Sequence, residues 1–197
     1  EDLRADRQPE FTQIDLEMSF ADSDDVISMQ EGLLKRIMKE LKGIDIDTPF
    51  PRLTYKEAME RYGSDKPDTR FDIELNKLND IFEESDFMVF KDALETGGDI
   101  RGISIPGGAA EFSRKKIDKL TDEAKHYGAK GLLWIKVEED GFSSSASKFL
   151  NDGELTKVAE RCGSKPGDII FIVSAQPKVV FDTLGWLRRK IAGILGL

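Results

Sequence analysis

The chain has 197 residues, of which 39% are hydrophobic and 34% are charged, and its net charge is −9. This length can form one or two domains with a sizeable core, and no apolar run reaches the length of a membrane span. Nonspecific RNA binding depends on Lys and Arg neutralising phosphates, so the acidic balance argues against a protein that coats nucleic acid. This net charge is compatible with RNA contact through a local basic patch.

The single cysteine and the single histidine limit the cellular compartment and the kinds of metal site that the sequence predicts. A single cysteine, Cys162, excludes an internal disulfide framework and fits a reducing compartment. The chain opens without the basic and apolar pattern of a secretory leader, so we expect a cytoplasmic protein. One cysteine and one histidine, His126, cannot form a zinc site of the usual kind, and no metal site is predicted.

Apolar and polar residues alternate strictly between residues 11 and 20, which predicts a β-strand. One face carries Gln13, Asp15, Glu17 and Ser19. Two carboxylates and an amide in a row indicate the lining of a ligand cleft, and the alternative is a solvated sheet face. If this strand lacks its partner, we expect either disorder there or pairing with a second copy through its exposed backbone groups.

Two helices are predicted next, each with recognisable ends. Asp22 or Ser23 can cap the first helix, and Gly43 ends it after an apolar stripe at helical spacing. Thr54 and Glu57 form a capping box for a shorter helix that ends before Gly63. The loop Ser64-Asp-Lys-Pro-Asp follows.

The middle of the chain predicts an α+β domain with short connections. A helical pattern at 75–82 leads to strands at 87–90, 100–105, 132–137 and 168–174, with helices at 113–127 and 154–161. A two-layer fold, with both helices on one face of a four-stranded, mainly antiparallel sheet, is the economical packing. A last helix from Pro177 to Leu195 is predicted to belong to a core, and membrane-surface binding is the alternative.

The string DLRADRQPEFTQID at residues 2–15 resembles the second signature motif of class II aminoacyl-tRNA synthetases, in the form found in bacterial aspartyl-tRNA synthetases. The resemblance implies that Glu1 and Gln8 contact ATP and that Phe11 stacks on its adenine. It also implies that Asp15 holds the ammonium of aspartate and that Gln13 supports this pocket. The family arginine that binds the α-phosphate is expected two residues before Glu1.

A second resemblance covers residues 72–176, which look like the GAD insertion domain of the same family. The strings Ile105-Pro-Gly-Gly-Ala, Tyr127-Gly-Ala-Lys-Gly-Leu and Ala146-Ser-Lys-Phe-Leu carry it. It implies three parts: a catalytic-domain segment at 1–71, the GAD domain at 72–176 and a return helix at 177–197. The implied parent is a homodimeric ligase that uses ATP and Mg²⁺ to join aspartate to tRNA, and we expect the segment alone to be inactive with no cofactor bound.

Two groups of cations are candidates for tRNA contact. By resemblance, Arg4 and Arg7 lie in a loop that approaches the acceptor end of the tRNA, and salt bridges to nearby acids are the alternative. Residues 114–116 (Arg114, Lys115 and Lys116) begin a helix just after a Gly-Gly turn, an arrangement that can attract an anion. The alternative is a solvated face balanced by Glu111 and Asp118.

Two other classes of function remain open for the GAD-like part. It could be an RNA-interaction module of a tRNA-dependent amidotransferase subunit, although the motif at 1–15 argues against that class. It could also be a purely structural insertion that braces a catalytic domain. No catalytic residue in the sense of a proton donor or nucleophile is predicted, because this reaction depends on positioning and charge.

Overall fold

A computed structural model describes residues 8–197, and the chain divides into two compact units, residues 1–52 and 53–197. In the first unit, the described residues contain one helix, α1 (Ser23–Lys42). Asp22 caps it, since its side chain accepts hydrogen bonds from the backbone of Asp24 and Asp25. Gly43 ends it in the left-handed conformation. Both predicted ends are confirmed.

The strand predicted at 11–20 is wrong, because no strand occurs between residues 8 and 52. The described residues of this segment are nearly all exposed. A strand is stable only when its backbone groups pair with a neighbour, and the described part of the first unit contains no strand that could pair with this segment. Pairing with a second copy stays a prediction.

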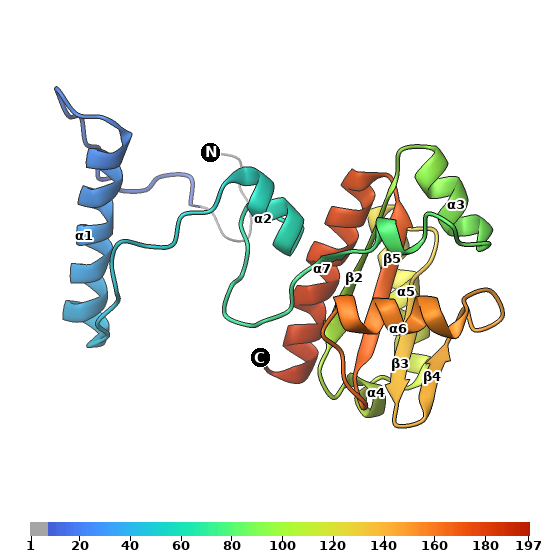
Figure 1. Cartoon of the computed structure of the whole chain (residues 1–197). Helices are drawn as coiled ribbons and strands as arrows, with labels where there is room; N and C mark the ends of the chain where they lie inside the picture. The colour runs from blue at the N-terminus through green and yellow to red at the C-terminus, as the bar shows by residue number, and fades with distance from the viewer. Residues whose placement is uncertain (1–7) are drawn as a thin grey trace. The chain divides into compact units, whose positions relative to one another are not determined.

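The second unit is built around one five-stranded antiparallel sheet with helices on both faces (Figure 1). The strands are β1 (Asn76–Lys77), β2 (Asp99–Ile105), β3 (Leu133–Glu138), β4 (Gly141–Ser144) and β5 (Ile169–Ala175), in the order β1-β2-β5-β3-β4. The helices are α2 (Tyr55–Tyr62), α3 (Met88–Glu95), α4 (Gly108–Glu111), α5 (Arg114–Ala124), α6 (Asp152–Arg161) and α7 (Pro177–Leu195). Two short 3₁₀ turns, η1 (Asn79–Ile81) and η2 (Lys125–Tyr127), complete the unit.

The α+β class and the antiparallel sheet are confirmed, but the two-layer arrangement and the count of four strands are wrong. The central strand β5 is buried on both faces. Phe171 and Val173 belong to a core shared with α5 and α7, whereas Ile170 and Ile172 belong to a second core shared with α3 and α6. A strand that is apolar on both faces needs a covering layer on each side.

Two predicted elements differ in type from the structure. The predicted strand at 87–90 is the start of helix α3, whose buried Phe90 packs into the second core. Short apolar runs cannot be assigned to helix or strand by period alone. The predicted helix at 75–82 is instead the edge strand β1, where Asn76 pairs with Gly102, followed by η1.

Candidate functional site

The residues that the resemblance assigns to ATP and aspartate lie at the start of the first unit. Gln8, Phe11, Gln13 and Asp15 are exposed, and none of them is enclosed by an apolar interior. Glu1, Arg4 and Arg7 lie outside the described residues. The described residues of the first unit do not assemble these groups into a pocket, so their ligand roles stay predictions.

The loop Ser64-Asp-Lys-Pro-Asp is held in place by a close backbone approach. Gly63 ends α2 in the left-handed conformation, and its carbonyl oxygen would lie 2.3 Å from a Cβ atom placed on Gly185 of α7. A Cβ on Gly63 would in turn lie 2.5 Å from the carbonyl oxygen of Phe181. The glycine pair therefore lets the end of α2, and the loop that follows it, sit directly on α7.

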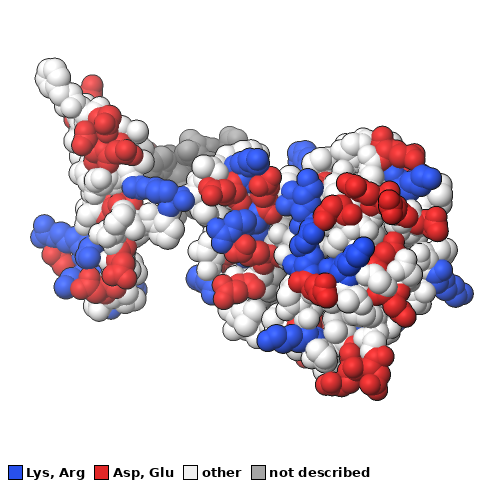
Figure 2. Space-filling model, viewed as in Figure 1, with Lys and Arg blue, Asp and Glu red and all other residues white. Residues whose placement is uncertain are grey.

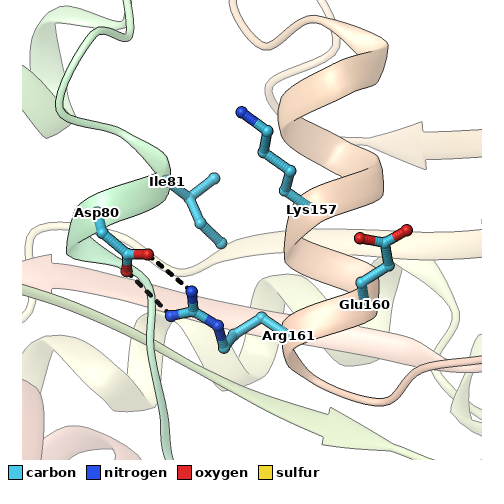
Figure 3. Close-up of a pocket in the computed structure, with 5 residues that line it drawn as sticks. All are labelled: Asp80, Ile81, Lys157, Glu160 and Arg161. Atoms are coloured by element: carbon cyan, nitrogen blue, oxygen red, sulfur yellow. Dashed lines mark hydrogen bonds and ion pairs between the residues drawn. The ribbon is translucent and has the colours of Figure 1, made fainter.

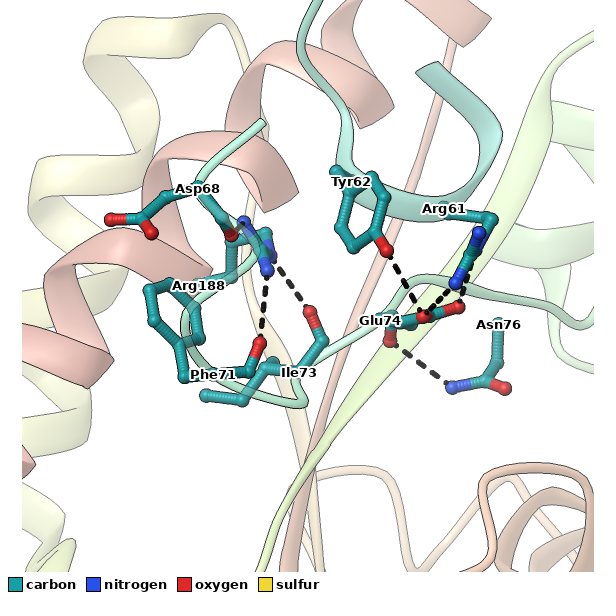
Figure 4. A network of polar contacts seen from close by, with 8 residues as sticks. All are labelled: Arg61, Tyr62, Asp68, Phe71, Ile73, Glu74, Asn76 and Arg188. Atoms are coloured by element: carbon teal, nitrogen blue, oxygen red, sulfur yellow. Dashed lines mark hydrogen bonds and ion pairs between the residues drawn. The ribbon is translucent and has the colours of Figure 1, made fainter. Parts of the chain in front are cut away.

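A buried arginine fastens the end of this loop (Figure 4). Arg188 of α7 is 1% exposed and donates hydrogen bonds to the carbonyl oxygens of Ile73 (2.7 Å), Asp68 (2.9 Å) and Phe71 (3.5 Å). Its guanidinium also lies over the rings of Phe71 (4.4 Å) and Tyr62 (4.9 Å). Backbone carbonyls and ring faces replace the water that this cation loses on burial.

Ion pairs on either side of the arginine restrain the same segment. Arg61 binds Glu74 through two hydrogen bonds of 2.9 and 2.6 Å, which hold the pKa of the Glu74 carboxyl below its usual range (Figure 4). Arg70 donates hydrogen bonds to the Asp68 carboxylate and lowers the pKa of that group to about 2. The loop between α2 and β1 is thus fixed at both of its ends.

The fixed loop forms one wall of an open pocket of about 560 Å³. Ser64 and Asp65 line it from the loop, Trp186 and Arg189 line it from α7, and Tyr127 lines it from η2. Tyr127 and Trp186 stack with their ring centres 5.0 Å apart and their planes 23° from parallel. The pocket combines flat aromatic surface, a cation and a carboxylate.

A second pocket, of about 450 Å³, lies between η1 and α6 (Figure 3). Arg161 of α6 crosses it and binds both carboxylate oxygens of Asp80, at 2.9 and 2.7 Å. The same guanidinium donates a hydrogen bond to the carbonyl of Lys77. Because the charges of the pair satisfy each other, this pocket leaves only Lys157 and Glu160 for a ligand, and we regard it as structural.

The basic cluster at residues 114–116 is exposed at the start of α5. Arg114 pairs with Asp118 at 3.1 Å, and Lys116 pairs with Glu111. Lys115 forms no ion pair with any described residue. The two acids named in the sequence analysis therefore balance two of the three cations, and Figure 2 shows acidic and basic side chains interspersed over the visible face of the second unit. Contact with tRNA stays a prediction for this cluster.

The single cysteine and the single histidine do not add a reactive group to either pocket. Burial raises the pKa of the Cys162 thiol to about 12, so it is not a reactive nucleophile. His126 is exposed, as the sequence predicts. Between residues 8 and 197 no three His, Cys, Asp or Glu side chains are grouped to hold a metal ion, and no helix there is long and apolar enough to cross a bilayer.

The sequence analysis missed the pocket beside the loop. Arg188 and Arg189 are adjacent in the sequence, yet Arg188 is buried and Arg189 is exposed. The burial of Arg188 could have been predicted from the helical period, because Leu184, Leu187, Arg188 and Ile191 follow one another at spacings of three, one and three. An arginine at such a position lies on the packed face of its helix. The core role predicted for the last helix is confirmed.

Comparisons with known proteins agree with the resemblance. Residues 90–184 match the GAD domain. The chain is 52% identical to an aspartate–tRNA ligase of Staphylococcus carnosus, with 100% of this chain and 34% of that protein covered. It is 55% identical to an aspartate–tRNA(Asp/Asn) ligase of Caldanaerobacter subterraneus, with 98% and 32% covered. An aspartate–tRNA ligase of Macrococcus caseolyticus is 54% identical, with 100% and 33% covered. The chain thus spans about a third of the length of the relatives it matches.

Proposed function

We propose, from the premise that this chain is a GAD-containing segment of the bacterial aspartate–tRNA ligase type, that the protein containing it activates aspartate with ATP and transfers it to tRNA. The observation that carries the proposal is the identity of 50–55% along the whole chain, including the motif at residues 2–15, to proteins named for this reaction. We further propose that this protein is a cytoplasmic homodimer.

In the proposed reaction the chain's side chains bind and orient. The Asp15 carboxylate pairs with the ammonium of aspartate, Gln13 supports it, and Phe11 offers its exposed ring to the adenine of ATP. Glu1 and Gln8 complete the ATP contacts, and Arg4 and Arg7 meet the tRNA. A carboxylate–ammonium pair is strong where water is excluded.

Magnesium accompanies ATP in this proposal and neutralises phosphate charge. The described residues do not form a metal cluster of their own, and none of them is proposed as a ligand of the ion. No role in the reaction is assigned through the ion to any residue of this chain.

The test uses the ligase that contains this segment. Asp15→Asn should raise the KM for aspartate in pyrophosphate exchange by about 10- to 100-fold, because one charge-assisted pair is lost. Asp47→Asn, an exposed acid of the same unit, serves as the matched control and should leave the KM unchanged. Absence of aspartate-dependent exchange in the unaltered ligase would refute the function, and exchange by the 197-residue chain alone would refute its expected inactivity.

The role of the GAD domain is tested separately. Charge reversal of Arg114, Lys115 and Lys116 should weaken tRNA binding and reduce its salt dependence if these cations contact phosphates. An unchanged affinity would favour the bracing role. RNA binding by residues 72–176 in a protein without aspartate activation would instead favour the amidotransferase-type module.

A further inference from the structure

The pocket beside the Ser64–Asp68 loop has the chemistry of a site for a flat, charged ligand. Its lining comes from three separate parts of the second unit: α2 with the loop that follows it, η2, and the stretch of α7 from Lys178 to Arg189. Arg188 and the Gly63–Gly185 approach fix two of these parts to each other. The pocket is therefore formed before any ligand arrives.

Aromatic side chains supply the flat surface. Tyr127 and Trp186 stack on each other, and Tyr127 keeps 39% of its surface exposed. Tyr55, which also lines the pocket, is 72% exposed. Exposed aromatic rings beside a cation are the usual platform for the bases of single-stranded RNA, since every base has a face that can stack.

The charged groups of the pocket are divided into a neutralised pair and two free groups. Lys178 forms an ion pair with Asp182 of the same helix turn. Arg189 donates only to the carbonyl of Gly185, at 3.3 Å, and forms no ion pair with a residue between 8 and 197. Asp65 is exposed and forms no hydrogen bond or ion pair within the same described range. A cation and a carboxylate are therefore available to a ligand.

We propose that this pocket binds one unpaired nucleotide of an RNA strand. The base stacks on the aromatic rings of Tyr55 and Tyr127, Arg189 donates to the phosphate, and Asp65 accepts hydrogen bonds from an amino or hydroxyl group of the nucleotide. The volume of about 560 Å³ lies within the range of small-ligand sites. The inference rests on the proposed function, because a ligase of this type would meet tRNA, which has unpaired nucleotides at its 3′ end and in its loops.

Intrinsic fluorescence of the 197-residue chain tests the site. The chain has two tryptophans, so Trp134→Phe leaves Trp186 as the only reporter. Titration with single-stranded oligo(A) and oligo(C) RNA hexamers should quench Trp186 in a saturable way, whereas an RNA duplex of the same length should not. Tyr127→Ala should weaken binding by roughly 5- to 150-fold, the factor that corresponds to one lost base stack. Tyr127→Phe should bind RNA with the same affinity as the chain that carries Tyr127.

Matched variants separate the pocket from general effects. Phe149→Ala removes an exposed aromatic ring that is stacked elsewhere, on Phe87, and should leave the affinity unchanged. Arg189→Gln should weaken binding and lower the salt slope by about one, and Arg36→Gln, on α1, should do neither. Tyr55→Ala and Arg189→Gln alter exposed side chains, so they keep the test valid if Tyr127→Ala does not fold.

No quenching by any hexamer, equal binding of the duplex, or unchanged affinity in both Tyr55→Ala and Arg189→Gln would overturn the proposal. These outcomes are independent of the ligase activity. If the ligase that contains this segment charges tRNA with aspartate but the 197-residue chain does not bind single-stranded RNA, the nucleotide site alone is refuted. A parent that charges no tRNA would refute the proposed function, whatever the hexamers do.

Discussion

Helices α1 and α7 have nearly the same length, 20 and 19 residues, but are stabilised differently. Glu31 is the only buried residue of α1, whereas eight residues of α7 are buried against the sheet unit. α1 has a complete capping box and complementary charges in its first and last turns. α7 lacks a side-chain cap and begins with a proline. A helix of about this length can thus be specified by local caps and charges, as in α1, or by tertiary packing, as in α7.

The largest difference should appear when a leucine is truncated in each helix. Leu184→Ala removes a fully buried side chain of α7 and should lower the free energy of unfolding of the second unit by about 2–5 kcal/mol. Leu34 of α1 is 47% exposed, so Leu34→Ala should leave that quantity nearly unchanged. Denaturant unfolding followed by Trp134 and Trp186, both in the second unit, measures it. Equal effects of the two substitutions would contradict the contrast.

Glycine-to-alanine substitutions should have opposite effects on stability at packed and at open positions of the two helices. Gly185→Ala should destabilise the second unit by about 1–3 kcal/mol, because the new Cβ would meet the Gly63 carbonyl oxygen at 2.3 Å. At Gly193 in α7 and Gly32 in α1, an added Cβ would meet no atom within 4 Å. Replacing either with alanine should instead stabilise its helix by about 0.5–1 kcal/mol. Thermal unfolding and far-ultraviolet circular dichroism report the sign.

Removing the cap of α1 should have a smaller effect, confined to that helix. Asp22→Ala deletes the acceptor for the backbone of Asp24 and Asp25 and should weaken α1 by about 1 kcal/mol, visible as a loss of helical circular dichroism. Gln176→Ala, at the same position of α7, removes a hydrogen bond to the carbonyl of Thr96 but no capping bond, so it should leave the helical circular dichroism of α7 unchanged. Equal losses in both variants would show that α1 is not specified by its cap.

The smallest expected effect concerns pH. Asp68 has a folded-state pKa of about 2, below its ordinary value of 3.8, chiefly because Arg70 donates hydrogen bonds to it. Its stabilising contribution is therefore complete above pH 4 and is lost as the pH falls toward 2. Carboxyl titration by nuclear magnetic resonance should show the pKa of Asp68 raised toward its ordinary value in Arg70→Gln, while the backbone N–H of residue 70 keeps part of the shift. An unchanged low pKa in that variant would assign the shift to another group.

Elements with strong local signals could be predicted from the sequence. The capping residues Asp22 and Thr54 and the stop signals Gly43 and Gly63 act through neighbouring backbone groups, so their positions were readable without the fold. The helix at α7 was also readable, because its apolar residues follow the helical period.

Elements that depend on distant partners could not be predicted. The alternation at residues 11–20 describes a strand only if a second strand lies beside it, whereas the run at 87–90 became a helix because Phe90 fills a core made by other elements. The pocket was hidden for the same reason: Tyr127, Asp65 and Trp186 are far apart in sequence and meet only through the packing of α7.

The contact between Arg188 and Ile73 joins positions 115 residues apart, and the matched GAD domain at 90–184 lies wholly between them. The segments on either side of the matched residues are therefore tied to each other by one guanidinium. Because α7 also packs into the core that contains Phe171 and Val173 of β5, these flanking segments and the sheet form one compact unit.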